Sequence, residues 1–479
     1  MRFLSSRLVL RTALLAALWS HVGPEAALAH TELRRAEPAA DAVLGRPPTE
    51  VRLWFTTSVQ LPPDAIVVIG PDGRRVDRGE AGVDSGDSRI VTVALDAALP
   101  GVYRVRWSVL SPDGHPVRGG YRFTVESGTE AADRAATPGT APPEQPAEAR
   151  PPPPETEASG VPGLALGRWL HLVGLALALG PLVVGLLAKE AAGSILFWRL
   201  WRVSLGGTLL LLLAAGWTLL AQGAALGGSL AAGARAEMVG AVLASRYGQL
   251  WIGRLLLVLL LLALAGYAER RRASRSARLA WAGLALGAPL LLLTSMSGHA
   301  ATTDPVWLSV SVDWVHLAAA AAWVGGLIAF PLAVFPALGG RPTGERARVL
   351  GVLVPRFSRL ALTSVMLLVL TGLYPAWRHV GSPAALASTA YGQTLLAKLL
   401  LVALILVPAA TNRFRVRPHL AAGAVSEKEA LALVSRFRRS VGIEAVLGAA
   451  ILAAAALLVS LPPAKQPEPS HSVASDYHR

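Results

Sequence analysis

The sequence predicts an N-terminal all-β Greek-key sandwich followed by an all-α polytopic membrane domain of about eight helices. Three observations predict this combination. Only 16% of the 479 residues are charged and 53% are hydrophobic, whereas a water-soluble chain carries about 25% charged residues. Beyond residue 163 the apolar residues gather into eight stretches of membrane-spanning length. Before residue 127 they form short, β-branched and aromatic runs separated by turn residues.

The charge and cysteine content narrow the classes of function. The formal net charge is +14. The basic residues cluster in short loops between apolar runs, so this charge is explained by the orientation of membrane helices and not by nucleic-acid binding. We therefore expect no nucleic-acid partner. The chain has no cysteine, which excludes disulfides, thiolate metal sites and cysteine nucleophiles. A bound metal would have to use His, Asp, Met or the N-terminal amine.

Residues 1–29 have the pattern of a secretory signal. Arginines occur at the start, an apolar run follows through Trp19, and Ala27 and Ala29 occupy the small-residue positions before a cleavage site. The apolar run is too short to span a bilayer as a stable helix. Cleavage after Ala29 makes His30 the first residue of the mature chain.

Residues 30–127 are expected to form the β-sandwich. Runs such as "VRLWFTTSV", "RIVTVAL" and "GVYRVRWSVL" alternate with turn signals such as "GPDG", and about seven strands of this kind suggest a Greek-key arrangement. Residues 128–162 are rich in Pro, Ala and Glu and are expected to form an extended, semi-rigid tether.

Residues 163–462 are expected to form the membrane domain, and residues 463–479 an extracytoplasmic tail. Because the signal exports the β domain, the first helix enters the cytoplasmic membrane from outside. The loops then predicted inside carry 20 Lys and Arg, against about 5 outside, as the positive-inside rule requires. Both termini are therefore expected outside. The predicted spans lie near 164–187, 203–224, 250–268, 279–297, 313–337, 359–378, 393–411 and 441–461.

The membrane domain contains an internal repeat. "WLHL" at 169–172 recurs as "WVHL" at 314–317, and "YGQLWIGRLLLV" at 247–258 recurs as "YGQTLLAKLLLV" at 391–402 with seven of twelve positions identical. A chance match of leucine-rich segments is disfavoured, because Trp, His, Tyr, Gly and Gln all recur. Four helices is an even number, so two parallel four-helix repeats related by a pseudo-two-fold axis along the membrane normal are expected.

A metal site is predicted in the β domain. The amine and imidazole of a mature N-terminal His30 can chelate one metal ion, and Asp113 and His115 lie two residues apart in "SPDGHPV". Three nitrogens and one carboxylate oxygen suit Cu(II) better than Cu(I), which prefers sulfur. A surface or turn histidine is the alternative for either residue alone, but their pairing in a small exported domain favours metal binding.

The same residues carry a family resemblance. The start "HTELRRAEPAADAVL", the run "VRLWFTTSV" and the closing "SPDGHPVRGGYRFTV" resemble the CopC family of extracytoplasmic copper-binding domains. The resemblance implies Cu(II) ligation by His30, Asp113 and His115. Some members of that family also have a Met-rich Cu(I) site. No methionine occurs between Met1 and Met238, so this second site is not expected.

Several histidines are predicted inside or at the edge of the membrane. His171 and His316 occupy matching repeat positions, and His299 follows Met296 by three residues at the outer end of a span. Intramembrane ionisable residues are candidates for function, and these four residues form a possible copper path. Interfacial histidines that cap helices or bond the backbone are the alternative. Weaker candidates are His379, Asp313 and Trp323.

Repeat-related Arg254 and Lys398 are interpreted as side chains that extend to the headgroups. The segments "SGHAA" at 297–301, "DWVHLAAAAAWVGGL" at 313–327 and "YGQTLLAKLLL" at 391–401 resemble the CopD family of copper-resistance membrane proteins. That resemblance implies copper movement across the inner membrane, usually inward.

The sequence thus predicts a copper transporter rather than an enzyme, with copper ions, the lipid bilayer and extracytoplasmic copper donors as its partners. No Walker A or Cys-Pro-Cys motif is present, and an inside-negative potential favours cation entry by about 2.3 kcal/mol per charge per 100 mV. Two alternatives remain open. One is a membrane electron-transfer protein that binds haem through histidine pairs, and the other is a copper buffer or sensor that transports nothing.

Overall fold

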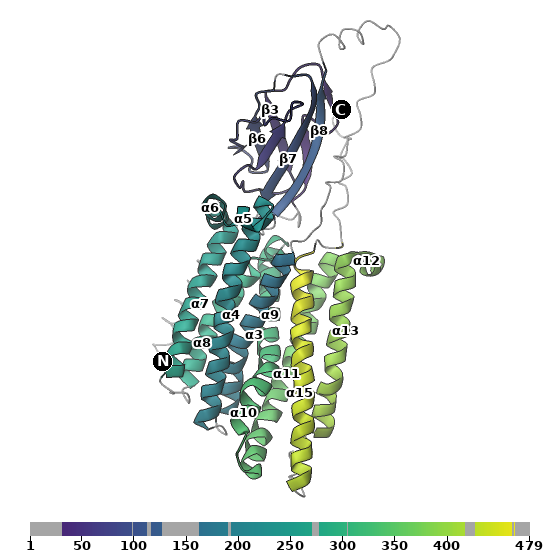
Figure 1. The fold of residues 1–479 in the computed structure, drawn as a ribbon. Coiled ribbons are helices and arrows are strands. Elements are labelled where there is room, and N and C mark those ends of the chain that lie inside the picture. The colour runs from purple at the N-terminus through teal and green to yellow at the C-terminus, as the bar shows by residue number, and fades with distance from the viewer. Residues whose placement is uncertain are drawn as a thin grey trace, which may run out of the picture.

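The computed structural model describes residues 31–97, 99–112, 116–126, 162–189, 193–270, 277–303, 305–416, 427–461 and 464. A β domain stands on one end of a long helical bundle (Figure 1). We call this the β-domain end of the bundle. The short helices α5, α6 and α12 lie there, while α10 lies at the opposite, far end.

Two four-stranded sheets form the β domain, with strand orders β1-β3-β6-β5 and β2-β8-β7-β4. Burial alternates along β3 and β7, as expected for strands with one face on a core. The predicted sandwich is confirmed, with eight strands in the described residues: β1 (Leu33–Glu37), β2 (Val43–Leu44), β3 (Glu50–Phe55), β4 (Ile66–Ile69), β5 (Gly82–Val83), β6 (Ile90–Ala94), β7 (Gly101–Leu110) and β8 (Pro116–Val125). The two-residue strands β2 and β5 are too short for alternation to reveal them in sequence.

Aromatic side chains fill the core between the sheets. Tyr103 stacks on Phe123 with ring centroids 5.0 Å apart, and Phe55 meets Trp107 edge-on at 5.2 Å. The hydroxyl of the fully buried Tyr103 donates to the carbonyl of Leu99 at 2.6 Å. The hydroxyl of Tyr103 is therefore satisfied within the domain.

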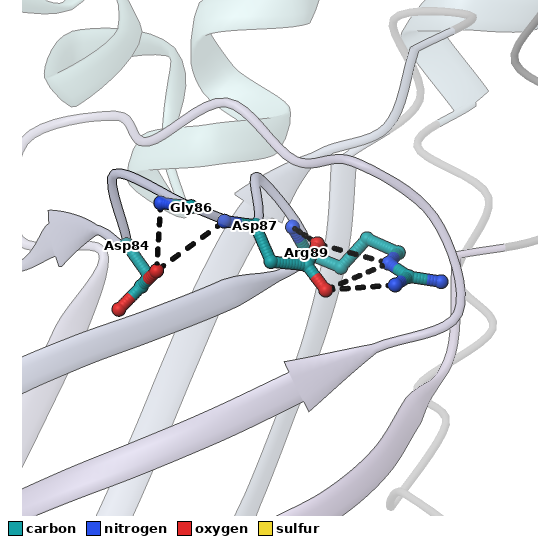
Figure 2. A network of polar contacts seen from close by, with 4 residues as sticks. All are labelled: Asp84, Gly86, Asp87 and Arg89. Atoms are coloured by element: carbon teal, nitrogen blue, oxygen red, sulfur yellow. Dashed lines mark hydrogen bonds and ion pairs between the residues drawn. The ribbon is translucent and has the colours of Figure 1, made fainter.

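The turn between β5 and β6 is held by two aspartates (Figure 2). Asp84 Oδ1 accepts from the backbone N–H groups of Gly86 at 2.9 Å and Asp87 at 3.3 Å. Asp87 accepts from the side chain of Arg89, at 2.7 Å from the terminal guanidinium nitrogen, and from its backbone N–H at 3.0 Å. These bonds to Arg89 lower the pKa of Asp87 to about 2, so the turn keeps its charge well into acid.

Eight helical segments of the described chain are long and apolar enough to cross a membrane, as predicted. The helical elements are α3 (Pro162–Ala188), α4 (Ser194–Gly227), α5 (Leu230–Gly233), α6 (Ala236–Ala244), α7 (Arg246–Arg270), α8 (Ala277–Ser295), the 3₁₀-helix η1 (His299–Thr302), α9 (Val306–Ala329), the π-helix η2 (Phe330–Val334), α10 (Phe335–Leu338), α11 (Thr343–Val380), α12 (Pro383–Ser388), α13 (Ala390–Thr411), the π-helix η3 (Asn412–Val416) and α15 (Glu427–Leu458).

Three helices begin well before their predicted spans. The structure starts α4 at Ser194, α11 at Thr343 and α15 at Glu427, where the sequence predicts starts near 203, 359 and 441. The additional turns carry arginines, which the hydropathy pattern assigns to loops. A helix makes its backbone hydrogen bonds internally, both inside and outside the apolar layer. Hydropathy therefore marks where the chain enters the bilayer and not where the helix begins.

The two halves of the bundle meet through repeat-related residues. Gly180 on α3 and Gly325 on α9 are separated by the repeat offset and touch each other: a Cβ on Gly180 would lie 2.2 Å from the carbonyl carbon of Gly325. The indole of Trp169 donates to Ala449 O at 3.2 Å, and that of Trp314 donates to Ala288 O at 2.9 Å.

Trp169 of the first half thus bonds α15, and Trp314 of the second half bonds α8. Each of these helices is the fourth long helix of the opposite half. Contact between equivalent residues is what a two-fold axis requires. The axis along the membrane normal stays a prediction.

Candidate metal sites

The three predicted ligands in the β domain, His30, Asp113 and His115, lie outside the described residues. Their neighbours are described, and they converge on one segment, residues 56–60. Thr31 Oγ1 lies 2.5 Å from Thr57 Oγ1. On the other side of the segment, Gln60 and Leu110 exchange two backbone hydrogen bonds of 2.9 Å each. Leu110 lies two residues before Pro112. Thr31, the first described residue, and the end of β7 therefore flank the same segment. We call residues 110–112 the hairpin tip.

This hairpin tip contacts the bundle. The buried Leu110 packs against Leu226 of α4 and Val242 of α6, with Tyr247 of α7 beside them. Arg246 adds two polar contacts: its backbone N–H donates to Gln60 Oε1 at 3.2 Å, and its guanidinium donates to Pro112 O at 3.0 Å. The β domain is thus seated on the α6–α7 corner of the first half (Figure 1), a contact that hydropathy and motif spacing did not reveal.

Two histidines, one from the connection between the halves and one from the second half, come together at the β-domain end of the bundle. The ring centroids of His299 in η1 and His379 near the end of α11 are 6.2 Å apart, and His379 lies at the same distance from the ring of Tyr391 on α13. The Oγ1 of Thr303 lies 3.4 Å from His379 Nε2. The Tyr391 hydroxyl lies 3.4 Å from His379 Nδ1, so both ring nitrogens of His379 have a hydroxyl partner, one of which a bound ion would displace.

His379 is buried, with 9% of its surface exposed, and it was the weaker of the two in sequence. Its partner lies 80 residues away along the chain, so no local spacing connects them. Tyr391 and Thr303 were missed for the same reason: each is an ordinary polar residue near a helix start until the fold brings it to His379.

A charged pair lies next to these histidines. Asp313 on α9 interacts electrostatically with Lys398 on α13 and with His299, while the hydroxyl of Ser295 on α8 donates to Val310 O at 3.1 Å. On α13, Lys398 is seven residues after Tyr391 and therefore on nearly the same face of the helix. The sequence-based interpretation of Lys398 as a side chain reaching the headgroups leaves out this acidic partner.

His171 and His316 each bond a threonine on a neighbouring helix. Thr294 Oγ1 donates to Leu290 O at 2.8 Å, so it accepts the hydrogen bond from His171 Nε2–H at 3.1 Å. Likewise Thr371 Oγ1 donates to Leu367 O and accepts from His316 Nδ1–H at 2.9 Å. Each neutral imidazole is then left with one nitrogen lone pair, Nδ1 in His171 and Nε2 in His316, which is the form that ligates a metal.

The remaining two candidates from sequence are packing residues in the structure. Met296 is 8% exposed and packs in an apolar cluster with Ala301 and Val310, to which Leu250 of α7 is added. Trp323 is 4% exposed and belongs to the main core of the bundle. Met296 thus borders the η1 turn that carries His299, whereas Trp323 packs against the central helices.

One buried acid was missed in sequence. Glu444 on α15 is 4% exposed, and its Oε1 accepts from Asn412 Nδ2 at 2.6 Å and from Ser440 Oγ at 3.4 Å. Counting along the helices at 1.5 Å per residue, Glu444 lies about 21 Å from the β-domain end and His316 about 15 Å. A carboxylate within an apolar span is costly and marks a candidate site.

The chain matches three protein-family profiles in succession. They are described as "CopC domain" over residues 33–126, "Copper resistance protein D-like, N-terminal domain" over 158–310 and "Copper resistance protein D" over 351–458. The first covers the β domain, and the other two cover most of the helical bundle.

Individual proteins agree with these matches. The copper transport protein CutJ of Bacillus subtilis is 28% identical over 459 residues, covering 93% of this chain and 76% of CutJ. Protein YobA of Escherichia coli is 33% identical over 99 residues, covering 20% of this chain and 80% of YobA. The crystal structure of CopC from Methylosinus trichosporium OB3b has 32% sequence identity and a TM-score of 0.19, and covers 20% of this chain and 95% of that chain. The similarity to CutJ extends over both domains, and the similarity to YobA is limited to one.

Proposed function

Because the chain belongs to the copper-resistance and copper-transport family that joins a CopC domain to a CopD membrane domain, we propose that it imports copper. The β domain captures Cu(II) from extracytoplasmic donors, and the helical domain conducts copper across the cytoplasmic membrane. Capture and conduction then occur in one chain, and no separate carrier is needed between them.

The capture site consists of His30, Asp113 and His115. The amine and imidazole of His30, the imidazole of His115 and the carboxylate of Asp113 make a nitrogen-rich set suited to Cu(II). A shared site is supported by the neighbours of these residues: Thr31 bonds Thr57, and Leu110 pairs with Gln60, so both sides of the ligand set border one segment.

The observation that carries the proposal is the seating of the hairpin tip on the bundle. Arg246 holds Gln60 and Pro112 to the start of α7. One turn further along α7, Leu250 packs into the cluster around Met296 and Ala301, which borders His299. A copper ion released from the tip therefore meets the His299–His379 pair at the same end of the bundle, without a large domain movement.

The direction of transport follows from charge. The far end of the bundle carries the Lys- and Arg-rich loops, so the positive-inside rule assigns it to the cytoplasm and the β-domain end to the outside. An inside-negative potential then favours inward movement of a cation by about 2.3 kcal/mol per charge per 100 mV. This supports import without a nucleotide.

Cellular copper content tests the proposal. Cells that express the chain should accumulate more copper than cells without it, and a His299→Ala/His379→Ala double variant should lose the gain while it reaches the membrane at the same level. A fall in internal copper on expression of the native chain would contradict import. Unchanged copper would favour a buffer or sensor. A haem absorption band in the purified protein would favour electron transfer instead.

A further inference from the structure

We infer that copper enters beside His299, on the connection that follows α8, and crosses the membrane along second-half helices past His379, Asp313, His316 and Glu444. The matching route in the first half is closed to cations. This inference rests on the proposed transport function and deepens it, because it assigns the path to one of two repeats. The supporting observation is that the two halves have different residues at corresponding positions of the repeat.

The second half has acidic groups along the route. Asp313 and Lys398 have opposite charges and act electrostatically on each other, and Lys398 also acts on His316. Asp313 and His316 are three residues apart on α9 and so lie on neighbouring positions of one helix face. Deeper in the bundle, Glu444 is held by Asn412 and Ser440. A cation moving inward therefore meets imidazoles and carboxylates in alternation.

The first half carries a positive charge at both corresponding positions near its histidine. Asp313 corresponds to Arg168, and Lys398 corresponds to Arg254. Arg254 acts electrostatically on His171, and its guanidinium lies over the ring of Tyr247 at 5.6 Å. His171 is therefore next to a positive charge where His316 has a charge-balanced pair. Like charges repel strongly in an apolar medium, so a copper ion is excluded at this point.

Deeper in the first half, the polar cluster is replaced by apolar packing. The tripeptide "LGA" at 286–288 recurs at 447–449, and its alanines are the acceptors of the two repeat-related Trp bonds. This register matches Glu444 to Gly283. A Cβ on Gly283 would lie 2.5 Å from Leu182 Cδ1, and Asn412 is matched by the buried Ala268. Leucine and alanine side chains therefore fill the position of the buried acid.

The entrance differs in the same sense. In the first half, the corner between α6 and α7 is covered by the β domain, since Leu110 packs on Val242 and beside Tyr247. In the second half, Tyr391 at the position of Tyr247 contacts His379 instead. One mouth is therefore used for docking and the other holds the histidine pair.

Copper uptake into proteoliposomes tests this inference with variants matched by the repeat. The full chain is reconstituted with an inside-negative potential, and copper is supplied as Cu(II) alone or with ascorbate as Cu(I). His316→Gln should reduce the initial rate about 10- to 100-fold, whereas His171→Gln should leave it within about twofold. Glu444→Gln is a further variant in the second half and has the same expected loss. It replaces the His316 variant if that variant does not fold.

A charge pair supplies a readout that a purely structural role would not move. Asp313→Asn leaves the positive charge of Lys398 uncompensated and should slow uptake, and adding Lys398→Gln should restore most of the rate. Equal losses in the His171 and His316 variants, or a loss in the His171 variant alone, would overturn the one-half path while leaving import standing. Absence of uptake by the native chain would instead overturn the proposed function itself.

Discussion

At the scale of single residues, the function proposed for the β domain depends on a free amine. His30 supplies two of the four proposed donors only when the signal is cut after Ala29, because an amide nitrogen in a longer chain is a much poorer ligand than an amine. The fold near this residue does not depend on the cut, since Thr31 and Glu32 are bonded to Thr57 and Thr56.

A variant of the mature chain that retains one extra residue before His30 tests the role of the free amine. We expect its Cu(II) affinity to fall about 10- to 100-fold, since a ligand of the chelate is lost, while the β domain keeps its near-ultraviolet circular dichroism. Isothermal titration with Cu(II) measures the affinity. A Thr31→Ser variant, which keeps the hydroxyl contact, serves as the control. Unchanged affinity in the extended chain would remove the amine from the proposed site.

At the scale of elements, the important contact is between the β7–β8 hairpin and the start of α7. It combines the burial of Leu110 with two hydrogen bonds from Arg246. The second-half counterpart of Arg246 is Ala390, which has no such side chain. The docking contact therefore breaks the similarity of the two halves and holds the β domain to one of them.

We expect Arg246→Ala to weaken this docking and to slow copper transfer, but not copper capture. The variant loses the hydrogen bond from the charged guanidinium to Pro112 O, which costs about 1.5–3 kcal/mol, and keeps the backbone N–H bond to Gln60 Oε1. Crosslinking between the hairpin and α7 should decrease, and uptake should fall at low copper, while the Cu(II) affinity of the β domain stays constant. Arg235→Ala, in the neighbouring short loop, is the control. If uptake by the Arg246 variant is normal, transfer does not need the docked arrangement.

At the scale of the whole molecule, the bundle is organised around the crossing of α3 and α9. Gly180 and Gly325 let the two backbones touch, and a Cβ on Gly325 would lie 2.0 Å from Ala176 O. Each half is then bonded to the other by Trp169 and Trp314. The two halves are therefore held against each other at this crossing by close backbone contact and by two hydrogen bonds.

Gly325→Ala should destabilise this unit, because the added methyl group has no space at the crossing. Overpacking of this kind costs about 1–3 kcal/mol. Thermal unfolding of the purified protein in detergent measures the effect. Gly206→Ala is the matched control: this glycine lies in the membrane-spanning α4, and a Cβ there meets nothing within 4 Å. Equal melting temperatures for the two variants would contradict a close crossing.

Local patterns in the sequence sufficed for the class of each domain and for single candidate residues. Enrichment in β-branched and aromatic residues predicts β3 and β7, hydropathy predicts the eight spans, and the recurrence of Trp and His predicts the repeat. Residues such as Tyr391, Thr303 and Glu444 were not identifiable in this way, because their significance comes from partners on other helices. Lys398 was interpreted from its depth alone, and its electrostatic partner Asp313 lies 85 residues earlier.

The sequence by itself determined the longer β-strands and the eight segments long and apolar enough to cross a membrane, because these depend on residue pattern and apolar length within one segment. It also determined the donor set proposed for Cu(II), through the position of His30 after a cleavage signal. Only the tertiary structure decided that His299 meets His379, that the hairpin tip rests on α7, and that Asn412 holds the buried Glu444. These features depend on long-range contacts, which local patterns do not encode.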